Sequence, residues 1–163
     1  MFMGEFIIRD AREDDCEGIV SLIYELAVYE HLEKNFAATA ENLRHSLFTE
    51  RVARSAVAEL QGELVGYAVY FRNFSTFLCR GGMYLEDLYV KQSRRKMGIG
   101  FALLSYVAKR AEELNCGRPE WCCLDWNKPS IEFYRSIGAQ PLEDFTIYRL
   151  TGERITKLAE VFK

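Results

Sequence analysis

The stretch that decides the fold is Tyr84-Leu85-Glu86-Asp87-Leu88-Tyr89-Val90, followed directly by Lys91-Gln92-Ser93-Arg94-Arg95-Lys96-Met97-Gly98-Ile99-Gly100. Its first part is rich in aromatic, aliphatic and β-branched residues, which predicts a strand. Its second part is a short basic turn that ends in two glycines. Apolar residues then recur at spacings of three and four, which predicts a helix. The stretch therefore predicts a strand, a glycine turn and a helix in direct succession.

This arrangement is suited to binding an anion. The first N–H groups of a helix lack partners within the helix, and its N-terminus carries partial positive charge. Gly98 and Gly100 have no side chain that would keep a phosphate away from the backbone, and Arg94, Arg95 and Lys96 add positive charge. The spacing fits neither a Walker loop nor a complete G-x-G-x-x-G fingerprint. We therefore expect a phosphate site of another kind.

Two adjacent carboxylates, Glu86 and Asp87, interrupt the predicted strand. Neighbouring side chains on a regular strand point to opposite faces, so we expect one carboxylate to face the interior or a cleft. Burial there would raise its pKa. A carboxylate in a partly dry cleft can attract an ammonium group and accept its proton. The sequence leaves open which of the two does so.

Length and composition predict a soluble globular protein made of one domain, residues 1–163. The chain is 49% hydrophobic and 28% charged, with a net charge of −3, which does not favour nucleic acid or an anionic membrane. It has no apolar run of membrane-spanning length and no signal-peptide pattern, which predicts a cytoplasmic location. Five cysteines without a C-x-x-C pair, and two isolated histidines, predict reduced thiols and no metal site.

The remaining pattern predicts an α/β (α+β) fold. We expect strands at 6–8, 53–60, 64–71, 120–125 and 145–150, and a loop at 72–80. We expect helices at 14–32, after Thr39, from the glycine turn to about Asn115, after Asn127 and at 152–163. The hairpin around Gly62 requires antiparallel pairing, and the crossover from Tyr84 to Leu124 requires parallel pairing. The result is a mixed, mostly antiparallel central sheet with helices on both faces.

The segment Arg95 to Gly100 resembles the R/Q-x-x-G-x-G/A pyrophosphate loop of the GCN5-related N-acetyltransferases. The resemblance covers nearly the whole chain and is strongest to spermidine/spermine N1-acetyltransferases and their thialysine-acetylating relatives. Further matching segments are 25–30, 84–90 and 124–134, with Gly138-Ala139. The motif Leu124-Asp125-Trp126-Asn127 resembles the thialysine-acetylating branch more than the polyamine branch.

The resemblance implies acetyl-CoA as co-substrate, without a metal. Leu88 and Val90 would offer backbone groups to the pantetheine arm and the acetyl carbonyl, and 95–100 would hold the pyrophosphate. The cofactor-binding residues that the resemblance implies are Leu88, Tyr89, Val90, Arg95, Lys96, Met97, Gly98, Ile99, Gly100, Phe101, Asn127, Lys128, Pro129, Ser130 and Tyr134.

The resemblance also implies catalytic roles. Glu86 matches the glutamate that acts as base through water, and Tyr134 matches the tyrosine that protonates the departing thiolate. A buried packing role for Tyr134, a solvated Glu86 and Asp87 as the base remain alternatives. The implied substrate-binding residues are Tyr29, Glu30, Glu86, Asp87, Glu120, Trp121 and Cys122.

Three departures bear on the substrate. The polyamine enzymes carry glycine directly after the loop arginine, where this chain has Lys96, and a tryptophan where this chain reads Phe145-Thr146-Ile147-Tyr148. Arg72 and Arg80 are expected beside the active-site mouth, where they would repel a polycation.

The sequence thus predicts an N-acetyltransferase for a small amine, either a polyamine or a lysine-like amino acid such as thialysine. The alternatives are acetylation of another small amine or of a protein amino group, and a non-catalytic CoA-binding dimer. A homodimer is the implied assembly.

Overall fold

The computed structural model describes residues 6–162. Its contacts separate two compact units, one ending at Cys122 and the other beginning at Cys123. The first unit carries the sheet, and the second carries the last two helices. Each is described separately.

The first unit is built on a five-stranded sheet in the order β1-β2-β3-β4-β5. The first four strands pair antiparallel, and β5 pairs parallel to β4. This confirms the mixed, mostly antiparallel sheet, including the hairpin and the parallel crossover. The strands are β1 (Phe6–Asp10), β2 (Arg54–Leu60), β3 (Glu63–Ser75), β4 (Arg80–Val90) and β5 (Pro119–Trp121).

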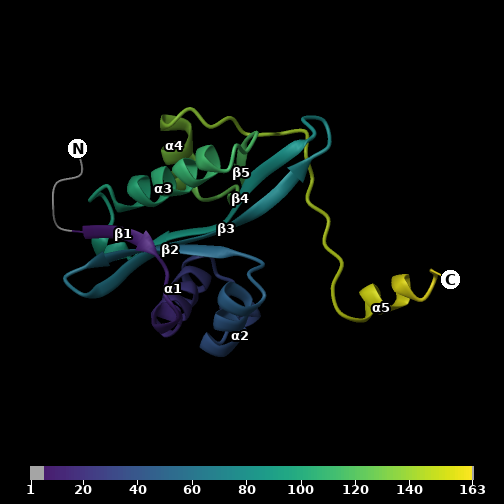
Figure 1. The fold of residues 1–163 in the computed structure, drawn as a ribbon, viewed down its shortest axis with the longest axis horizontal. Helices are drawn as coiled ribbons and strands as arrows, with labels where there is room; N and C mark the ends of the chain where they lie inside the picture. Colours follow the sequence, from purple (N-terminus) through teal and green to yellow (C-terminus); the bar gives the residue numbers. More distant parts are fainter. Residues whose placement is uncertain (1–5, 163) are drawn as a thin grey trace. The chain divides into compact units, whose positions relative to one another are not determined.

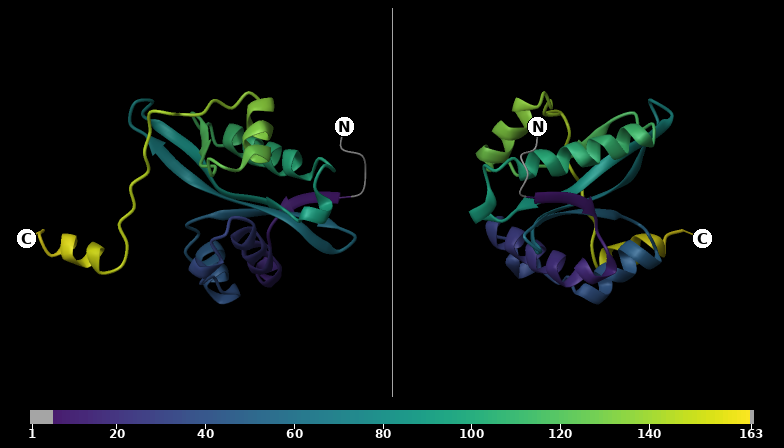
Figure 2. Two further views of the ribbon diagram at one scale, coloured as in Figure 1. Left: turned by 180° about the vertical axis from the view of Figure 1, so that it is seen from behind. Right: turned by 60° about the vertical axis from the view of Figure 1, so that its left-hand side comes forward.

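Helices cover both faces of this sheet (Figure 1). α1 (Cys16–Tyr29) and the short α2 (Ala40–Arg44) lie on one face, and α3 (Ile99–Glu113) lies on the other, as the further views also show (Figure 2). The Thr39 side chain accepts a hydrogen bond from the Asn42 amide and so begins α2 as predicted. The buried core under α1 consists of Ile19, Leu22, Val57, Tyr67 and Tyr89.

A β-bulge interrupts β4 at the site of the two carboxylates. Val69 of β3 pairs with Asp87 and Tyr70 pairs with Leu85, so Glu86 is an extra residue without a partner in the register. A bulge bends its strand and breaks the regular alternation of faces. The argument from alternation therefore does not apply to Glu86 and Asp87.

The predicted loop at 72–80 is wrong. β3 and β4 stay paired out to Ser75 and Arg80, which leaves only a short turn between them. The segment pairs despite its polar and glycine residues, because ladder hydrogen bonds need only the backbone. The Arg72 side chain lies over Gly81 of the paired strand.

The predicted strand at 120–125 is too long, because β5 ends at Trp121. Its pairing with β4 stops at Leu85, just before the bulge bends β4. Cys122 and Cys123 therefore do not lie on a strand.

The second unit contains α4 (Lys128–Ser136) and α5 (Glu153–Ala159). Asn127 caps α4, as predicted, by accepting a hydrogen bond from the Ser130 amide at 3.4 Å. The predicted strand at 145–150 is absent, because a strand requires a pairing partner and these residues have none in the described chain. Large apolar side chains in this unit are exposed, namely Leu142, Phe145, Ile147, Tyr148, Leu150, Ile155, Leu158, Val161 and Phe162.

Within residues 6–162, no helix combines the length and the apolar character that crossing a bilayer requires.

Candidate active site

The turn between β4 and α3 has the backbone that the sequence predicted for an anion site. Gly98 is the N-cap of α3 and has φ 82°, a left-handed conformation that strains any residue with a side chain. The Ala102 amide donates to the Gly98 carbonyl at 2.9 Å and so closes the first turn of the helix. The first amides of α3, a helix of fifteen residues, therefore have no partner within the helix and can bind an anion.

Lys96 also adopts a left-handed conformation, with φ 65°. This is the position at which the polyamine enzymes are expected to carry glycine. Glycine enters this region of φ at no steric cost, whereas lysine does so under strain. This chain therefore has lysine at a position whose backbone conformation favours glycine, and Lys96 adopts that left-handed conformation.

We expect Gly98→Val to weaken CoA binding at least tenfold, because a branched side chain would block the approach of a phosphate to the backbone. Gly62 is a matched control, since it has φ 81° and open space around its Cβ position, as Gly98 does. Gly62→Val introduces comparable strain in the turn between β2 and β3. Isothermal titration with CoA should show weakening only for Gly98→Val. Equal affinities in the two variants would contradict the assignment of this turn.

The two carboxylates of β4 have different surroundings. Asp87 is partly buried and accepts a hydrogen bond from Tyr67 Oη at 3.0 Å, whereas Glu86 is exposed. Burial raises the pKa of Asp87; the hydrogen bond from Tyr67 opposes this rise, and the charge of Glu86 adds to it. Asp87 is therefore the buried carboxylate that the sequence predicted without identifying it.

A second acidic group faces Asp87 from the end of α1. Glu30 follows Tyr29, the last residue of the helix, and its pKa is raised by burial and then by the charge of Asp87. Deeper in the same region, Tyr89 Oη donates to Glu25 Oε2 at 3.1 Å. Burial and this bond raise the pKa of Tyr89 to about 12, so the phenol stays protonated. We call Glu25, Glu30 and Asp87 the acidic cluster.

β4 has an unpaired edge beyond the bulge. In the described chain, β5 pairs only with Met83 to Leu85, so no strand pairs with 86–90 on the side away from β3. Backbone groups of Leu88 and Val90 on that edge are thus left without a ladder partner. This is where the resemblance expects the pantetheine arm to bind.

Side chains around β5 are engaged with their neighbours. Glu120 pairs with Arg118 at 3.1 Å and accepts a hydrogen bond from Asn73 at 3.2 Å. Tyr84 Oη donates to Cys122 Sγ at 3.0 Å, and this bond together with burial raises the pKa of Tyr84. The substrate contacts expected for Glu120, Trp121 and Cys122 stay a prediction.

The remaining expected residues lie in the second unit. Tyr134 is on α4, with its ring centroid 5.3 Å from that of Phe133. Lys128 and Pro129 form the first turn of the same helix, after the Asn127 cap. Their cofactor contacts and the catalytic role of Tyr134 stay predictions.

Arg80 does not lie at the mouth of this site. It donates to the Asn115 carbonyl at 2.9 Å, beyond the C-terminal end of α3, whereas the anion site is at the N-terminal end. A fifteen-residue helix is about 22 Å long. Arg72 pairs with Met83, on the far side of the bulge from Asp87. The expectation that these arginines repel a polycation at the site is therefore wrong for Arg80, and repulsion of a polycation by Arg72 stays a prediction.

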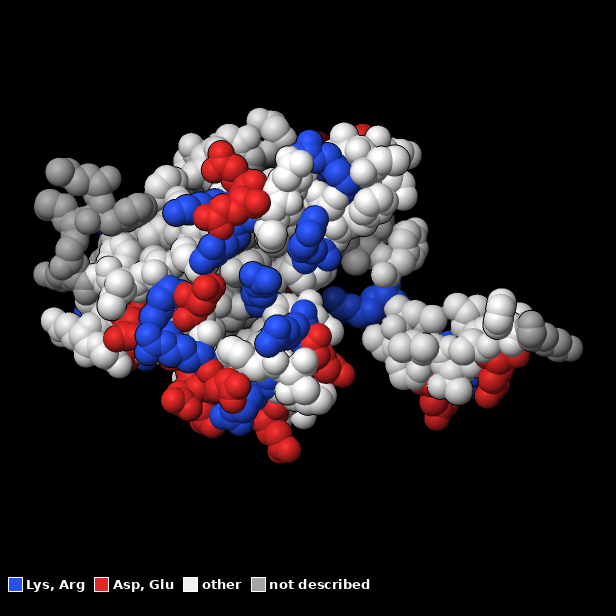
Figure 3. Space-filling model, viewed as in Figure 1, with Lys and Arg blue, Asp and Glu red and all other residues white. Residues whose placement is uncertain are grey.

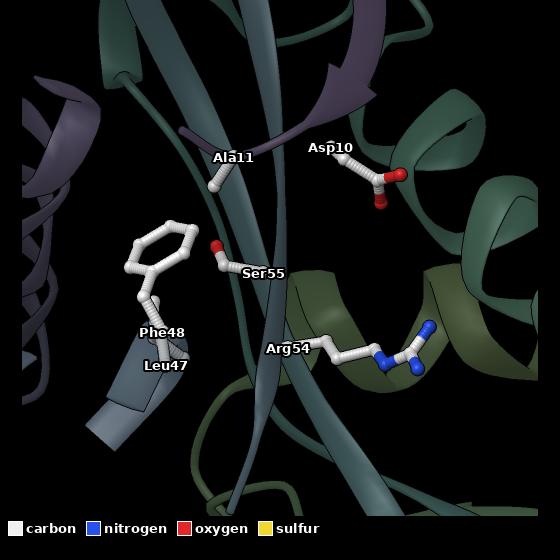
Figure 4. Close-up of a pocket in the computed structure, with 6 residues that line it drawn as sticks. All are labelled: Asp10, Ala11, Leu47, Phe48, Arg54 and Ser55. Carbon is white, nitrogen blue, oxygen red and sulfur yellow. The ribbon is translucent and has the colours of Figure 1, made fainter. Parts of the chain in front are cut away.

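A shallow pocket elsewhere in the first unit is separate from this site. It lies where β1 ends and β2 begins, with Asp10 and Arg54 on one side and Phe48 on the other (Figure 4). No residue that the sequence assigned to cofactor or amine lines it. Its lining consists of Asp10, Ala11, Leu47, Phe48, Arg54 and Ser55.

Charge is mixed on the face of the molecule in Figure 3, where basic and acidic side chains alternate. That face thus lacks the extended basic surface typical of nucleic-acid binding. No group of three or more histidine, cysteine, aspartate or glutamate residues in the described chain is arranged to hold a metal ion.

A glycine turn for an anion that follows a strand with a partly buried carboxylate is the arrangement that the sequence predicted, and comparison with known proteins decides the family. The model of the acetyltransferase (GNAT) family matches residues 16–139. The chain belongs to this family. It is therefore an N-acetyltransferase, and enzymes of the family use acetyl-CoA as co-substrate.

The acetyltransferase is 39% identical to the thialysine N-epsilon-acetyltransferase of Bos taurus, over 96% of this chain and 99% of that protein. It is 28% identical to the L-ornithine N5-acetyltransferase of Arabidopsis thaliana, over 91% of this chain and 85% of that protein. Among solved structures, an integron cassette protein from the mobile metagenome of V. cholerae matches with a TM-score of 0.80 and 30% identity, over 96% and 99% of the two chains. These matches confirm the predicted family group and fold.

Sequence reasoning missed Tyr67 and gave no role to Glu25. Both contact residues that it had singled out, Asp87 and Tyr89, across long sequence separations. A signal was available for Tyr67, because hairpin pairing places it opposite Tyr89 and thus diagonal to Asp87.

Proposed function

We propose that this acetyltransferase transfers the acetyl group of acetyl-CoA directly to the terminal primary amine of a small substrate, in a ternary complex. A lysine-like amino acid such as thialysine or ornithine is the first candidate acceptor, and a polyamine is the second. The names of the relatives support an amine at the end of an amino-acid side chain. Because Arg80 lies away from the site, spermidine and spermine stay among the candidates.

The observation that carries this proposal is the acidic cluster beside the anion turn. Asp87 and Glu30 are both partly buried; burial raises the pKa of each, and the charge of Asp87 adds to the rise for Glu30. Burying two carboxylates close together is costly unless a cation compensates them. The protonated amine of a substrate supplies that cation, and the turn at Gly98 supplies amides for the pyrophosphate.

In the proposed mechanism, Asp87 and Glu30 attract the ammonium group, and Glu86 accepts its proton through a water molecule. An exposed carboxylate at a bulge can reach solvent, which suits this role better than one held by Tyr67. The free amine attacks the thioester carbonyl, which backbone amides of β4 polarise. The tetrahedral intermediate collapses with loss of the CoA thiolate, which Tyr134 protonates.

We expect Tyr67→Phe to move the acid limb of the kcat/KM profile for the amine to higher pH. The hydrogen bond from Tyr67 lowers the pKa of Asp87, so its loss raises that pKa further. Ionised Asp87, the form that attracts the ammonium, then needs a higher pH to persist. Tyr70→Phe, which removes another buried tyrosine hydroxyl three residues further along β3, serves as control. An acid limb that stays in place or moves lower would contradict the role of Asp87.

Two other functions stay in view. A broader acetyltransferase for protein amino groups would require an acceptor site open enough for a chain, which partly buried Glu30 and Asp87 do not favour. A CoA-binding dimer without turnover would not need the carboxylate pair at all.

The deciding experiment measures CoA release with acetyl-CoA and a panel of amines. The panel holds thialysine, ornithine, lysine, diaminobutyrate, putrescine, spermidine and spermine, together with a lysine peptide blocked at both ends. The proposal predicts turnover of at least one free small amine, with the blocked peptide much poorer. CoA binding without turnover of any amine would favour the non-catalytic reading.

We also propose that the acetyltransferase is a homodimer located in the cytoplasm. The exposed apolar side chains between Leu142 and Phe162 support the dimer, because exposed apolar surface is often covered by a protein partner. Light scattering coupled to gel filtration should give twice the mass of the 18.9 kDa chain. A monomer at micromolar concentration would contradict this part.

A further inference from the structure

The Arg95 side chain faces the amine side of the site rather than open solvent. Its guanidinium carbon lies 4.5 Å from the centre of the Tyr29 ring and 5.7 Å from the centre of the Tyr89 ring. Its Nε donates to the Val90 carbonyl at 3.2 Å. Arg95 is thus held by two aromatic rings and one backbone oxygen, all in the first unit.

These contacts join two parts of the site that are far apart in the sequence. Tyr29 is the last residue of α1 and precedes Glu30 of the acidic cluster. Val90 is the last residue of β4, and Gly98 opens α3 three positions after Arg95. One side chain therefore connects the end of α1 to the turn between β4 and α3.

The chemistry of arginine suits this connection. A planar guanidinium can stack on an aromatic ring while its N–H groups, which lie in the guanidinium plane, donate hydrogen bonds to other partners. A lysine ammonium is a compact charge and cannot stack in this way. Arg95 also lies near Tyr89, whose hydroxyl donates to Glu25, and its charge opposes the rise in the pKa of that phenol.

We propose that Arg95 is a positioning residue for the acceptor amine: its side chain holds Tyr29 and Glu30 in place, while the backbone of its own segment serves the cofactor. This inference rests on the proposed function. Arg95, the first residue of the loop motif, would then have two roles. Its backbone would serve CoA, and its side chain would serve the amine. The loop segment as a whole had been expected to hold the pyrophosphate.

The test compares Arg95→Lys with Arg110→Lys. Arg110 is a matched control, because it also stacks on a tyrosine, Tyr106, at 4.9 Å, but away from the site. We expect Arg95→Lys to raise the amine KM about 3- to 30-fold, the range that a stacked cation contributes, with CoA affinity within about twofold of wild type. Arg110→Lys should leave both unchanged.

Variants of Tyr29 separate stacking from a general loss of structure. Tyr29→Leu should raise the amine KM as Arg95→Lys does, and the double variant should be no worse than the single ones, since both remove the same contact. Tyr29→Phe keeps the ring on which Arg95 stacks, so its amine KM should stay near that of wild type. A weakened CoA affinity with an unchanged amine KM would overturn the proposal and make the side chain a phosphate ligand.

Amide hydrogen exchange judges the inference independently of turnover. In Arg95→Lys, the amides of 26–30 should exchange faster than in wild type and in Arg110→Lys. Unchanged exchange in this segment would overturn the positioning role whatever the kinetics. If no amine in the panel were acetylated, the proposed function would fail, and the exchange data would still decide what Arg95 holds.

Discussion

Replacing Tyr134 with phenylalanine is expected to lower kcat by about 10²-fold or more, with little change in CoA affinity. The CoA thiolate is a poor leaving group unless it is protonated as the C–S bond breaks, and the phenol is the proposed donor. The ring itself remains, so packing on α4 beside Phe133 is preserved. Steady-state kinetics at saturating acetyl-CoA and amine measure the effect.

Tyr24→Phe is the matched control, because it removes a phenol from α1 without touching the proposed machinery. An acetyl thioester of an acidic aryl thiol provides a second check. Its leaving group needs no proton, so the defect of Tyr134→Phe should shrink with this donor. A wild-type rate in Tyr134→Phe would remove the acid role and leave Tyr134 as a packing residue.

Glu86→Gln is expected to slow turnover by about 10²-fold or more at neutral pH, where the amine is protonated and must lose a proton before it attacks. The defect should shrink as the pH rises toward the pKa of the amine, because free amine needs no base. Asp87→Asn is the informative comparison. It should chiefly raise the amine KM, since its proposed role is to attract the ammonium.

The opposite pattern would exchange the two roles. If Asp87→Asn lost turnover with a pH-dependent recovery while Glu86→Gln only raised KM, Asp87 would be the base. If neither variant affected turnover, the acid–base account of β4 would fail. Glu112→Gln, on the exposed face of α3, controls for the loss of one negative charge.

The central part of the fold was predictable because its signals are local. The strand before Lys91, the two glycines and the apolar spacing of α3 each follow from short-range preferences. The Thr39 and Asn127 caps were predictable for the same reason, since a capping side chain bonds an amide three residues away.

The parts that failed depend on distant partners. The run 145–150 has the composition of a strand, but a strand forms only where another offers its backbone. No glycine in the sequence indicates the bulge at Glu86, which can be recognised only from the register between β3 and β4. The bond from Tyr67 to Asp87 likewise required knowing which residues face each other across two strands. Stacking of Arg95 on Tyr29 joins elements that no local pattern connects.

The most direct test of the account is the structure of the acetyltransferase crystallised with CoA. The account predicts that pyrophosphate oxygens accept hydrogen bonds from the amides that open α3, after Gly98, with the pantetheine arm along the unpaired edge of β4. It further predicts that the Arg95 guanidinium stays on the Tyr29 ring. Pyrophosphate bound away from this turn, or a CoA that leaves the edge of β4 uncovered, would contradict it.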